Sequence, residues 1–210
     1  TMAGKIKGKV AIGPDGRLFI ASQGGDIREM EADGTAVWSR TGLGVFTASP
    51  AFSPDYETLY IGNEGGTFYA INAVTGATRW SKTLGGAIRS TAGIAVSGTI
   101  YVGCDDGKAY SLNPANGAVN WAFATGGPIS SSPCVDTGVV ESDDETTFFE
   151  RATFCSEDGT LYGREAQEIR QPGDQGVGAG QDERVGGRGV CHAADVRADQ
   201  SVRPGSIASL

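Results

Sequence analysis

The most reactive side chains in this sequence are its four cysteines, Cys104, Cys134, Cys155 and Cys191. No two of them are spaced as CxxC, and no cysteine–histidine spacing typical of a zinc site occurs. Cys104 and Cys155 fall in or next to predicted strands, where cysteine behaves as a small buried thiol. Cys191 precedes the single histidine, His192, in a polar segment where we expect no metal binding.

A second cluster is acidic, because the stretch from Asp136 to Glu150 holds six acidic residues and no basic one. Clustered carboxylates can bind calcium, but the spacing is not that of an EF-hand and Phe148-Phe149 interrupts it. Three interpretations stay open for the insertion at about 137–153. It is an acidic surface loop between strands, a retained non-coding segment of a gene model, or a calcium loop.

The tryptophans and many glycines recur at a fixed period. Tryptophan occurs at 38, 80 and 121, and glycines open each unit at 25, 66 and 107. A second set of glycines, at 34, 76 and 117, stands four residues before each tryptophan. A period of about 41 residues indicates stacked or radial units. We therefore expect each indole to pack over its own unit and dock on the next, with its N–H bonded to a backbone acceptor.

Each unit contains four short predicted strands. In the second unit they are SPAFS (49–53), TLYIGN (58–63), TFYAIN (67–72) and ATRWSK (77–82), separated by glycine-containing turns. The opening glycines suit tight hairpins because glycine tolerates positive φ. No stretch shows helical periodicity without a glycine or proline in it. The sequence predicts an all-β fold of β-propeller blades, each of four antiparallel strands.

The recurring phrase closely resembles the PQQ-like β-propeller repeat, as it stands in TFYAINAVTGATRW (67–80) and KAYSLNPANGAVNW (108–121). That family contains quinoprotein alcohol dehydrogenases and non-enzymatic relatives, among them the propeller lipoprotein of the outer-membrane β-barrel assembly machinery. The resemblance covers roughly residues 10–162. It implies the fold rather than an activity, because the repeat is the family's structural part. The enzymes hold PQQ beside adjacent disulfide-bonded cysteines and bind calcium, and no such residues can be carried over here.

The length of 210 residues limits how much of a propeller is present. Propellers of this family have seven or eight blades, which at this period need roughly 290 to 330 residues. Residues 1–162 hold about three and a half blades, an incomplete ring that is predicted to be a piece of a longer protein. Such an arc exposes a blade face and a strand edge at each end. We expect a protein partner or further blades to cover them.

After Tyr162 the pattern stops. Residues 163–210 contain no Phe, Trp, Tyr or Lys, so we expect a disordered tail. The repeat predicts a glycine ten residues after Gly159 and a tryptophan four later, where the sequence has Ile169 and Gly173. A lost reading frame near residue 163 is our hypothesis, and an authentic disordered tail is the alternative.

Charge and hydropathy limit the function classes. The net charge of −8 argues against nucleic-acid binding, and no run of 18 apolar residues predicts a transmembrane helix. No signal peptide is recognisable, although the family resemblance suggests a periplasmic or extracellular setting. We predict a non-catalytic protein-binding or scaffold module with no cofactor and no assigned catalytic, cofactor-binding or metal-binding residue. The alternatives are a fragment of a PQQ-dependent dehydrogenase, with PQQ and calcium as cofactors, or an extracytoplasmic sensor domain.

Overall fold

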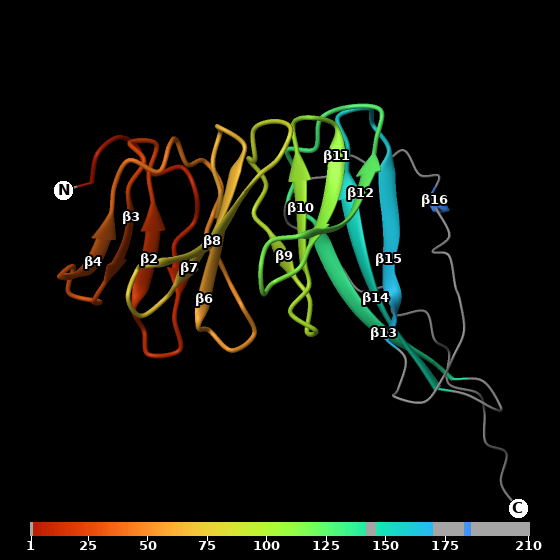
Figure 1. The fold of residues 1–210 in the computed structure, drawn as a ribbon, viewed down its shortest axis with the longest axis horizontal. Coiled ribbons are helices and arrows are strands. Elements are labelled where there is room, and N and C mark those ends of the chain that lie inside the picture. The colour runs from red at the N-terminus through yellow and green to blue at the C-terminus, as the bar shows by residue number, and fades with distance from the viewer. Residues whose placement is uncertain (1, 142–145, 170–182, 186–210) are drawn as a thin grey trace, which may run out of the picture.

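The computed structural model describes residues 2–141, 146–169 and 183–185. These residues form four sheets of four antiparallel strands, with no helix among them. The sheets follow one another in chain order and stand side by side in an open arc (Figure 1). We number them blades 1 to 4. The predicted all-β fold of propeller blades in an incomplete ring is confirmed.

The strand bounds match the predicted four-strand unit. Blade 1 contains β1 (Ala11–Ile12), β2 (Leu18–Ala21), β3 (Ile27–Met30) and β4 (Ala36–Arg40). Blade 2 contains β5 (Ala51–Phe52), β6 (Thr58–Gly62), β7 (Thr67–Asn72) and β8 (Thr78–Thr83). Blade 3 contains β9 (Gly93–Ile94), β10 (Ile100–Cys104), β11 (Lys108–Leu112) and β12 (Val119–Ala124). Blade 4 contains β13 (Cys134–Glu141), β14 (Thr146–Cys155), β15 (Leu161–Ile169) and β16 (Glu183–Val185).

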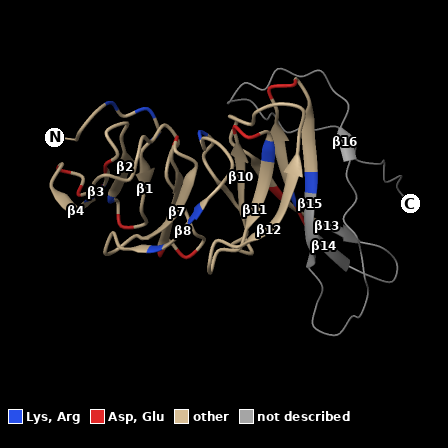
Figure 2. Ribbon diagram, turned by 45° about the horizontal axis from the view of Figure 1, so that its top comes forward, with Lys and Arg blue, Asp and Glu red and all other residues tan. Residues whose placement is uncertain are grey.

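Local sequence explains the hairpins. Gly66 and Gly107 have φ of 81° and 77° in the turns that lead into β7 and β11, as the repeat predicts. The fourth strands of blades 1 to 3 each carry a register shift beside the tryptophan, where one residue is skipped in the pairing. Such a bulge bends a strand and re-aims its side chains. Acidic residues lie in several of the turns at the strand ends (Figure 2).

The hydrophobic core consists of layers between neighbouring blades. One layer packs Phe19 and Ile27 of blade 1 against Leu59 and Ile71 of blade 2. Similar layers join blades 2 and 3 through Tyr60, Phe68, Ile100 and Leu112, and blades 3 and 4 through Tyr101, Ala109, Ala152 and Phe154. A blade is therefore stabilised chiefly by its neighbours, as in other repeat folds.

Blade 4 departs from the repeat in two ways that the sequence analysis did not foresee. The surplus residues at about 137–153, for which a surface loop was one of three interpretations, lengthen strands β13 and β14 into a long hairpin, with only 142–145 outside the described residues. Strand β15 continues to Ile169, past residue 162, where the repeats were predicted to end. The expected disorder of 170–182 and 186–210, and the hypothesis of a lost frame, concern residues outside those described.

Candidate functional site

The middle blades are buried on both faces. All five residues of β6 are buried, with Leu59 and Ile61 packed against blade 1 and Tyr60 packed against blade 3. Strand β10 repeats the arrangement, since Ile100 and Val102 pack toward blade 2. In this fold, apolar residues on both faces of a strand indicate a blade with two neighbours.

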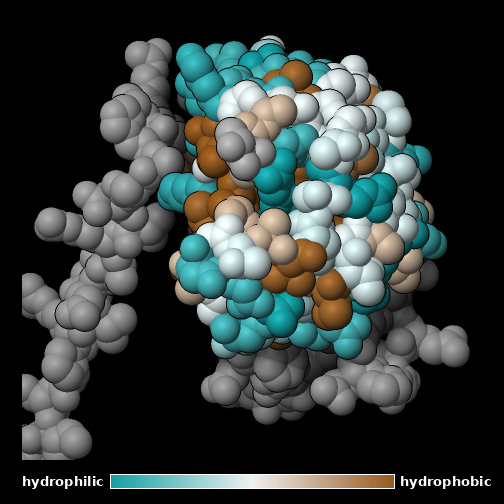
Figure 3. All heavy atoms as spheres, turned by 90° about the vertical axis from the view of Figure 1, so that its left-hand side faces the viewer, coloured by the Kyte–Doolittle hydropathy of each residue, from teal (hydrophilic) through white to brown (hydrophobic). Residues whose placement is uncertain are grey.

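One face of blade 1 has no blade against it among the described residues. Strand β2 alternates, with Phe19 and Ala21 buried against blade 2 and Leu18 and Ile20 half-buried on the opposite side. The cross-strand register extends this side, because Leu18 pairs with Ile12 in β1 and with Met30 in β3. We call the surface of Ile12, Leu18, Ile20, Arg28 and Met30 the open face. Figure 3 views the molecule from this end, where hydrophobic surface lies among hydrophilic side chains.

The repeat register shows what the open face would be in a middle blade. Leu18 and Ile20 lie 41 residues before Leu59 and Ile61, which are 0% and 1% exposed. Ile12, by contrast, is 63% exposed. Blade 1 thus presents to solvent the side chains that blades 2 and 3 bury against a preceding blade, and an exposed apolar surface of this kind marks an interaction site.

Arg28 is the polar exception on the open face. Its Nη2 lies 3.4 Å from Oδ2 of Asp26, whereas its Nε is buried and has no hydrogen-bond partner. Tyr69 occupies the equivalent position of blade 2, and its hydroxyl donates to the carbonyl of Leu43 in the preceding linker at 3.3 Å. A buried donor without an acceptor is costly, and the part of Arg28 that a partner could contact is the rest of the side chain, which is 19% exposed.

The tryptophans join the blades as the sequence predicts. The Trp38 indole N–H donates to the carbonyl of Ala73 in blade 2 at 2.9 Å, and Trp80 donates to Pro114 in blade 3 at 2.8 Å. Each ring lies on a glycine of the next blade. A Cβ added to Gly76 would meet the Trp38 ring at 2.7 Å, and one added to Gly117 would meet Trp80 at 2.5 Å.

A belt of hydrogen bonds along the first strands was missed in the sequence analysis. A backbone N–H beside each first strand donates to a hydroxyl of the next blade, in the pairs Lys9 to Ser49 at 2.8 Å, Ser49 to Thr91 at 3.1 Å and Thr91 to Ser132 at 3.0 Å. The signal was the recurrence of Ser or Thr between units, in TASPAF, STAGIA and SSPCVD. The belt holds adjacent blades in register.

Carboxylates strengthen the junction between blades 3 and 4. Asp158 accepts hydrogen bonds from the Tyr162 hydroxyl at 2.8 Å and from the Gly126 N–H at 2.7 Å. Partial desolvation opposes ionisation, but these bonds and others from Thr160 outweigh it and lower the pKa of Asp158 to about 2. Asp158 therefore stays ionised and links the β14–β15 turn to the linker that follows β12.

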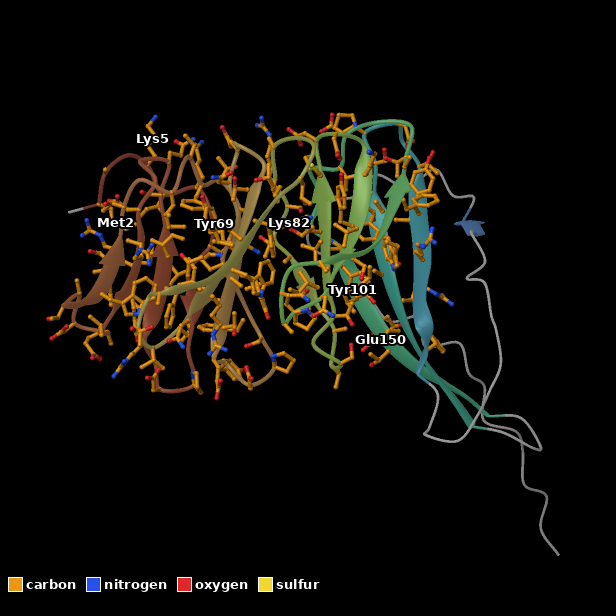
Figure 4. All side chains as sticks on the ribbon, viewed as in Figure 1. Met2, Lys5, Tyr69, Lys82, Tyr101 and Glu150 are labelled. Carbon is orange, nitrogen blue, oxygen red and sulfur yellow. The ribbon has the colours of Figure 1, made fainter. Side chains whose placement is uncertain are left out.

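Glu150 plays a similar part on the opposite edge. It is 2% exposed and accepts hydrogen bonds from the N–H and hydroxyl of Ser97 at 3.1 and 2.9 Å. Figure 4 shows Glu150 on the long hairpin near Tyr101 of blade 3. Burial, followed by the charge of Glu150, raises the pKa of Tyr101. These groups are structural, because they are enclosed between the blades.

Comparison with known proteins identifies the repeat. The family model described as outer membrane protein assembly factor BamB matches residues 1–137 and, in an overlapping match, 89–167. The chain belongs to this PQQ-like β-propeller family. The predicted resemblance, including its similarity to the outer-membrane assembly propeller, is confirmed.

Solved structures share the fold at low sequence identity. BamB from Moraxella catarrhalis is 22% identical with a TM-score of 0.60, over 76% of this chain and 46% of that one. The chain therefore spans about half the length of that BamB. A computationally designed protein, Ika4, is 14% identical with a TM-score of 0.60, over 78% of this chain and 92% of that one. The WD40 repeats of RRP9 are 14% identical with a TM-score of 0.62, over 78% and 48%. No curated protein sequence matches the chain.

The cysteines of this BamB-family chain differ in their bonding. Cys104 is a fully buried free thiol, as predicted, and burial raises its pKa to about 11. Cys134 is free and exposed. The prediction of a buried thiol at Cys155 is wrong, because Cys155 is half-buried and disulfide-bonded. Cys191 and His192 lie outside the described residues.

The described residues do not fit a quinone centre with calcium. Within 2–141, 146–169 and 183–185, no three His, Cys, Asp or Glu side chains are grouped so that they could hold a metal ion. The two free cysteines belong to separate strands, β10 and β13. We derive no chemical step through PQQ. A helix long and apolar enough to cross a membrane is also not found in the described part of the chain.

Proposed function

We propose that this chain is a non-catalytic β-propeller module that binds protein through the open face of blade 1, as part of a larger propeller. The observation that carries the proposal is the contrast between equivalent positions. Leu59 and Ile61 are fully buried, whereas their counterparts Leu18 and Ile20 remain half-buried and Ile12 is 63% exposed. Covering such apolar surface is favourable at roughly 25 cal/mol per Å².

Polar groups at the same face add specificity. The Arg28 side chain is 19% exposed at this face, and a protein backbone presents carbonyl oxygens to which a guanidinium can donate at regular intervals. A partner with an apolar strand face and a carbonyl near Arg28 therefore suits this surface better than a small solute does. The rigid blades behind it supply a surface that needs little ordering on binding.

The family also favours this role. The matched model describes an outer membrane protein assembly factor, and a periplasmic or extracellular setting for this chain is part of the proposal. Because the chain spans about half of the Moraxella BamB, a larger propeller is the natural context for an arc with a bare blade face.

Site-specific photo-crosslinking tests the proposal. A benzophenone amino acid is placed at Ile12, 63% exposed on the open face, and in a separate variant at Val74, 69% exposed in a turn of blade 2. Both variants are expressed in the cells that produce the chain and irradiated there. We expect protein adducts from position 12 and few from position 74, with the site of attachment mapped by mass spectrometry. Equal yields, or none from position 12, would contradict the proposal.

A further inference from the structure

Two positions in each of blades 1 to 3 hold only glycine or alanine. The first position lies in the first strand and is Ala11, Ala51 or Gly93. The second lies at or next to the end of the second strand and is Ala21, Gly62 or Gly103. The following blade and its linker leave little room there. A Cβ added to Gly93 would stand 2.6 Å from Val135, and one added to Gly62 would enter the side chain of Ile88.

Blade 4 has cysteine at both of these positions. Cys134 in the first strand pairs with Thr153 in the second, as Ala51 pairs with Tyr60 in blade 2. Cys155 follows Thr153 by two residues, as the small residues of the other blades follow the partner of their first strand. The pairing register therefore places two cysteines where the repeat otherwise has no side chain larger than a methyl group.

The two cysteines lie on the same side of the sheet. Ala152 and Phe154 of β14 face blade 3 and are 0% and 1% exposed, so the alternating residues Thr153 and Cys155 face the other side. Cys134 shares that side with its cross-strand partner. Diagonal neighbours of this kind have Cβ atoms about 7 Å apart. We call the surface of Cys134, Thr153 and Cys155 the outer face of blade 4, the last sheet of the arc (Figure 1).

The two sulfurs differ in their bonding. Cys134 is an exposed free thiol, whereas Cys155 is half-buried and disulfide-bonded. Cys104 and Cys134 are both free, so Cys155 is bonded to neither of them. A free thiol beside a disulfide is the reactant pair of thiol–disulfide exchange, in which a thiolate attacks one of the two bonded sulfurs.

We propose that the outer face of blade 4 is a thiol–disulfide exchange site, in which Cys134 attacks Sγ of Cys155. Cys134 gives its proton to solvent, and its thiolate forms a new S–S bond with Cys155. The bond between Cys155 and its present partner breaks, and the partner's sulfur leaves with the electron pair as a thiolate. One disulfide is lost and one is formed, so the step needs no oxidant or reductant.

The surroundings hold the attacked residue in place. The Cys155 N–H donates to the Ser131 hydroxyl at 3.2 Å, and the same hydroxyl donates to the Cys155 carbonyl at 2.9 Å. A disulfide requires Cβ atoms about 3.8 Å apart, so the diagonal pair has to close by about 3 Å. A bond formed under such strain is easily broken again. We therefore expect a reversible exchange, with the Cys134–Cys155 bond as its less stable form.

The chain's own tryptic peptides allow a direct test. The full chain is held at pH 7 or pH 8 under argon, and the reaction is stopped with acid at intervals. Free thiols are then alkylated with a maleimide. Trypsin separates Cys134, in peptide 109–151, from Cys155, in peptide 152–164, and leaves Cys104 in peptide 90–108. Mass spectrometry of the monomer from a non-reducing gel identifies the peptides that are linked.

We expect a link between peptides 109–151 and 152–164, formed several times faster at pH 8 than at pH 7 because the thiolate is the attacking form. Cys134→Ser should abolish the link and keep Cys155 in its present bond. Cys104→Ser is the matched control, since it removes the other free thiol, which is 0% exposed between blades 2 and 3. It should leave the rate unchanged, and circular dichroism checks that both variants fold.

Three results would overturn the proposal. The first is no link between the two peptides at either pH. The second is loss of the original Cys155 bond at the same rate in Cys134→Ser, which would assign the attack to another thiol. The third is a link confined to dimers, which would place the exchange between chains. The inference is independent of protein binding at the open face of blade 1, so none of these results bears on crosslinking from Ile12.

Discussion

Replacement of Gly76 by alanine tests the reasoning about the blade contacts most directly. Two costs are expected. The first is the strain of a Cβ at φ of 70°, about 1 kcal/mol after the smaller entropy of the unfolded alanine chain is allowed for. The second is displacement of the Trp38 ring, since the new Cβ would stand 2.7 Å from it.

The second cost can be estimated from two contributions. Forcing extra volume into a packed site costs roughly 1–3 kcal/mol. Loss of the 2.9 Å hydrogen bond from the indole to Ala73 adds about 1 kcal/mol. We therefore expect Gly76→Ala to lower the free energy of unfolding by about 3–5 kcal/mol, measured by urea denaturation at 25 °C.

Gly34→Ala is the matched comparison, because that glycine has φ of 91° and nothing within 4 Å of an added Cβ. It should cost only the strain, about 1 kcal/mol. In a Trp38→Ala background the cost of Gly76→Ala should fall to the same value. Equal costs for the two glycines in the original chain, within about 0.5 kcal/mol, would refute the view that the indole contact holds the blades together.

Three further predictions concern ionisable groups. Because its pKa is lowered to about 2, Asp158 stabilises the fold fully above about pH 4, and this stabilisation is lost as the pH falls through 2. Asp158→Asn should therefore make the urea midpoint depend less on pH between pH 4 and 2. An unchanged pH dependence of the midpoint would contradict this. Glu150→Ala should cost about 1–3 kcal/mol because it removes two hydrogen bonds from Ser97 to a carboxylate, and Glu150→Gln, which keeps an acceptor, should cost less in the same assay. Cys104 is buried and has a pKa of about 11, so it should react with iodoacetamide at pH 8 about a hundredfold more slowly than exposed Cys134. Mass spectrometry of each cysteine peptide measures the two rates. Comparable rates would show that the reagent reaches Cys104 between the blades.

The fold could be predicted because its signals are local and repeated. Turn glycines such as Gly66, and strands with alternating apolar residues, depend on near neighbours in sequence and appear in three copies. The role of the tryptophans also followed, since a residue that recurs in register belongs to the architecture. The Trp38 and Trp80 hydrogen bonds confirm it.

What the sequence could not provide was the contribution of blade 4. Glu150 looked like part of an acidic insertion, because Ser97, the partner of its buried carboxylate, lies 53 residues away. The belt from Lys9 to Ser132 was missed for a related reason. Its donors are backbone N–H groups, which leave no signature in the sequence, and only the hydroxyl acceptors recur.

The two ends of the arc illustrate why one face is a stronger candidate than the other. At the blade 4 end, Trp121 packs against Phe154 with the Arg164 guanidinium over its ring, and no glycine turn lies on that indole within the part of the chain that the structure describes. A cation over an indole contributes roughly 0.5–1 kcal/mol. At the blade 1 end nothing replaces the missing neighbour among the described residues.

Gly34 alone would not establish a binding site, because a tight turn at positive φ accounts for a glycine by itself. Leu18, Ile20 and Ile6 have no such local reason to be apolar. That all three are apolar in register with Leu59, Ile61 and Phe46, which are 0–1% exposed, favours a partner that covers this face.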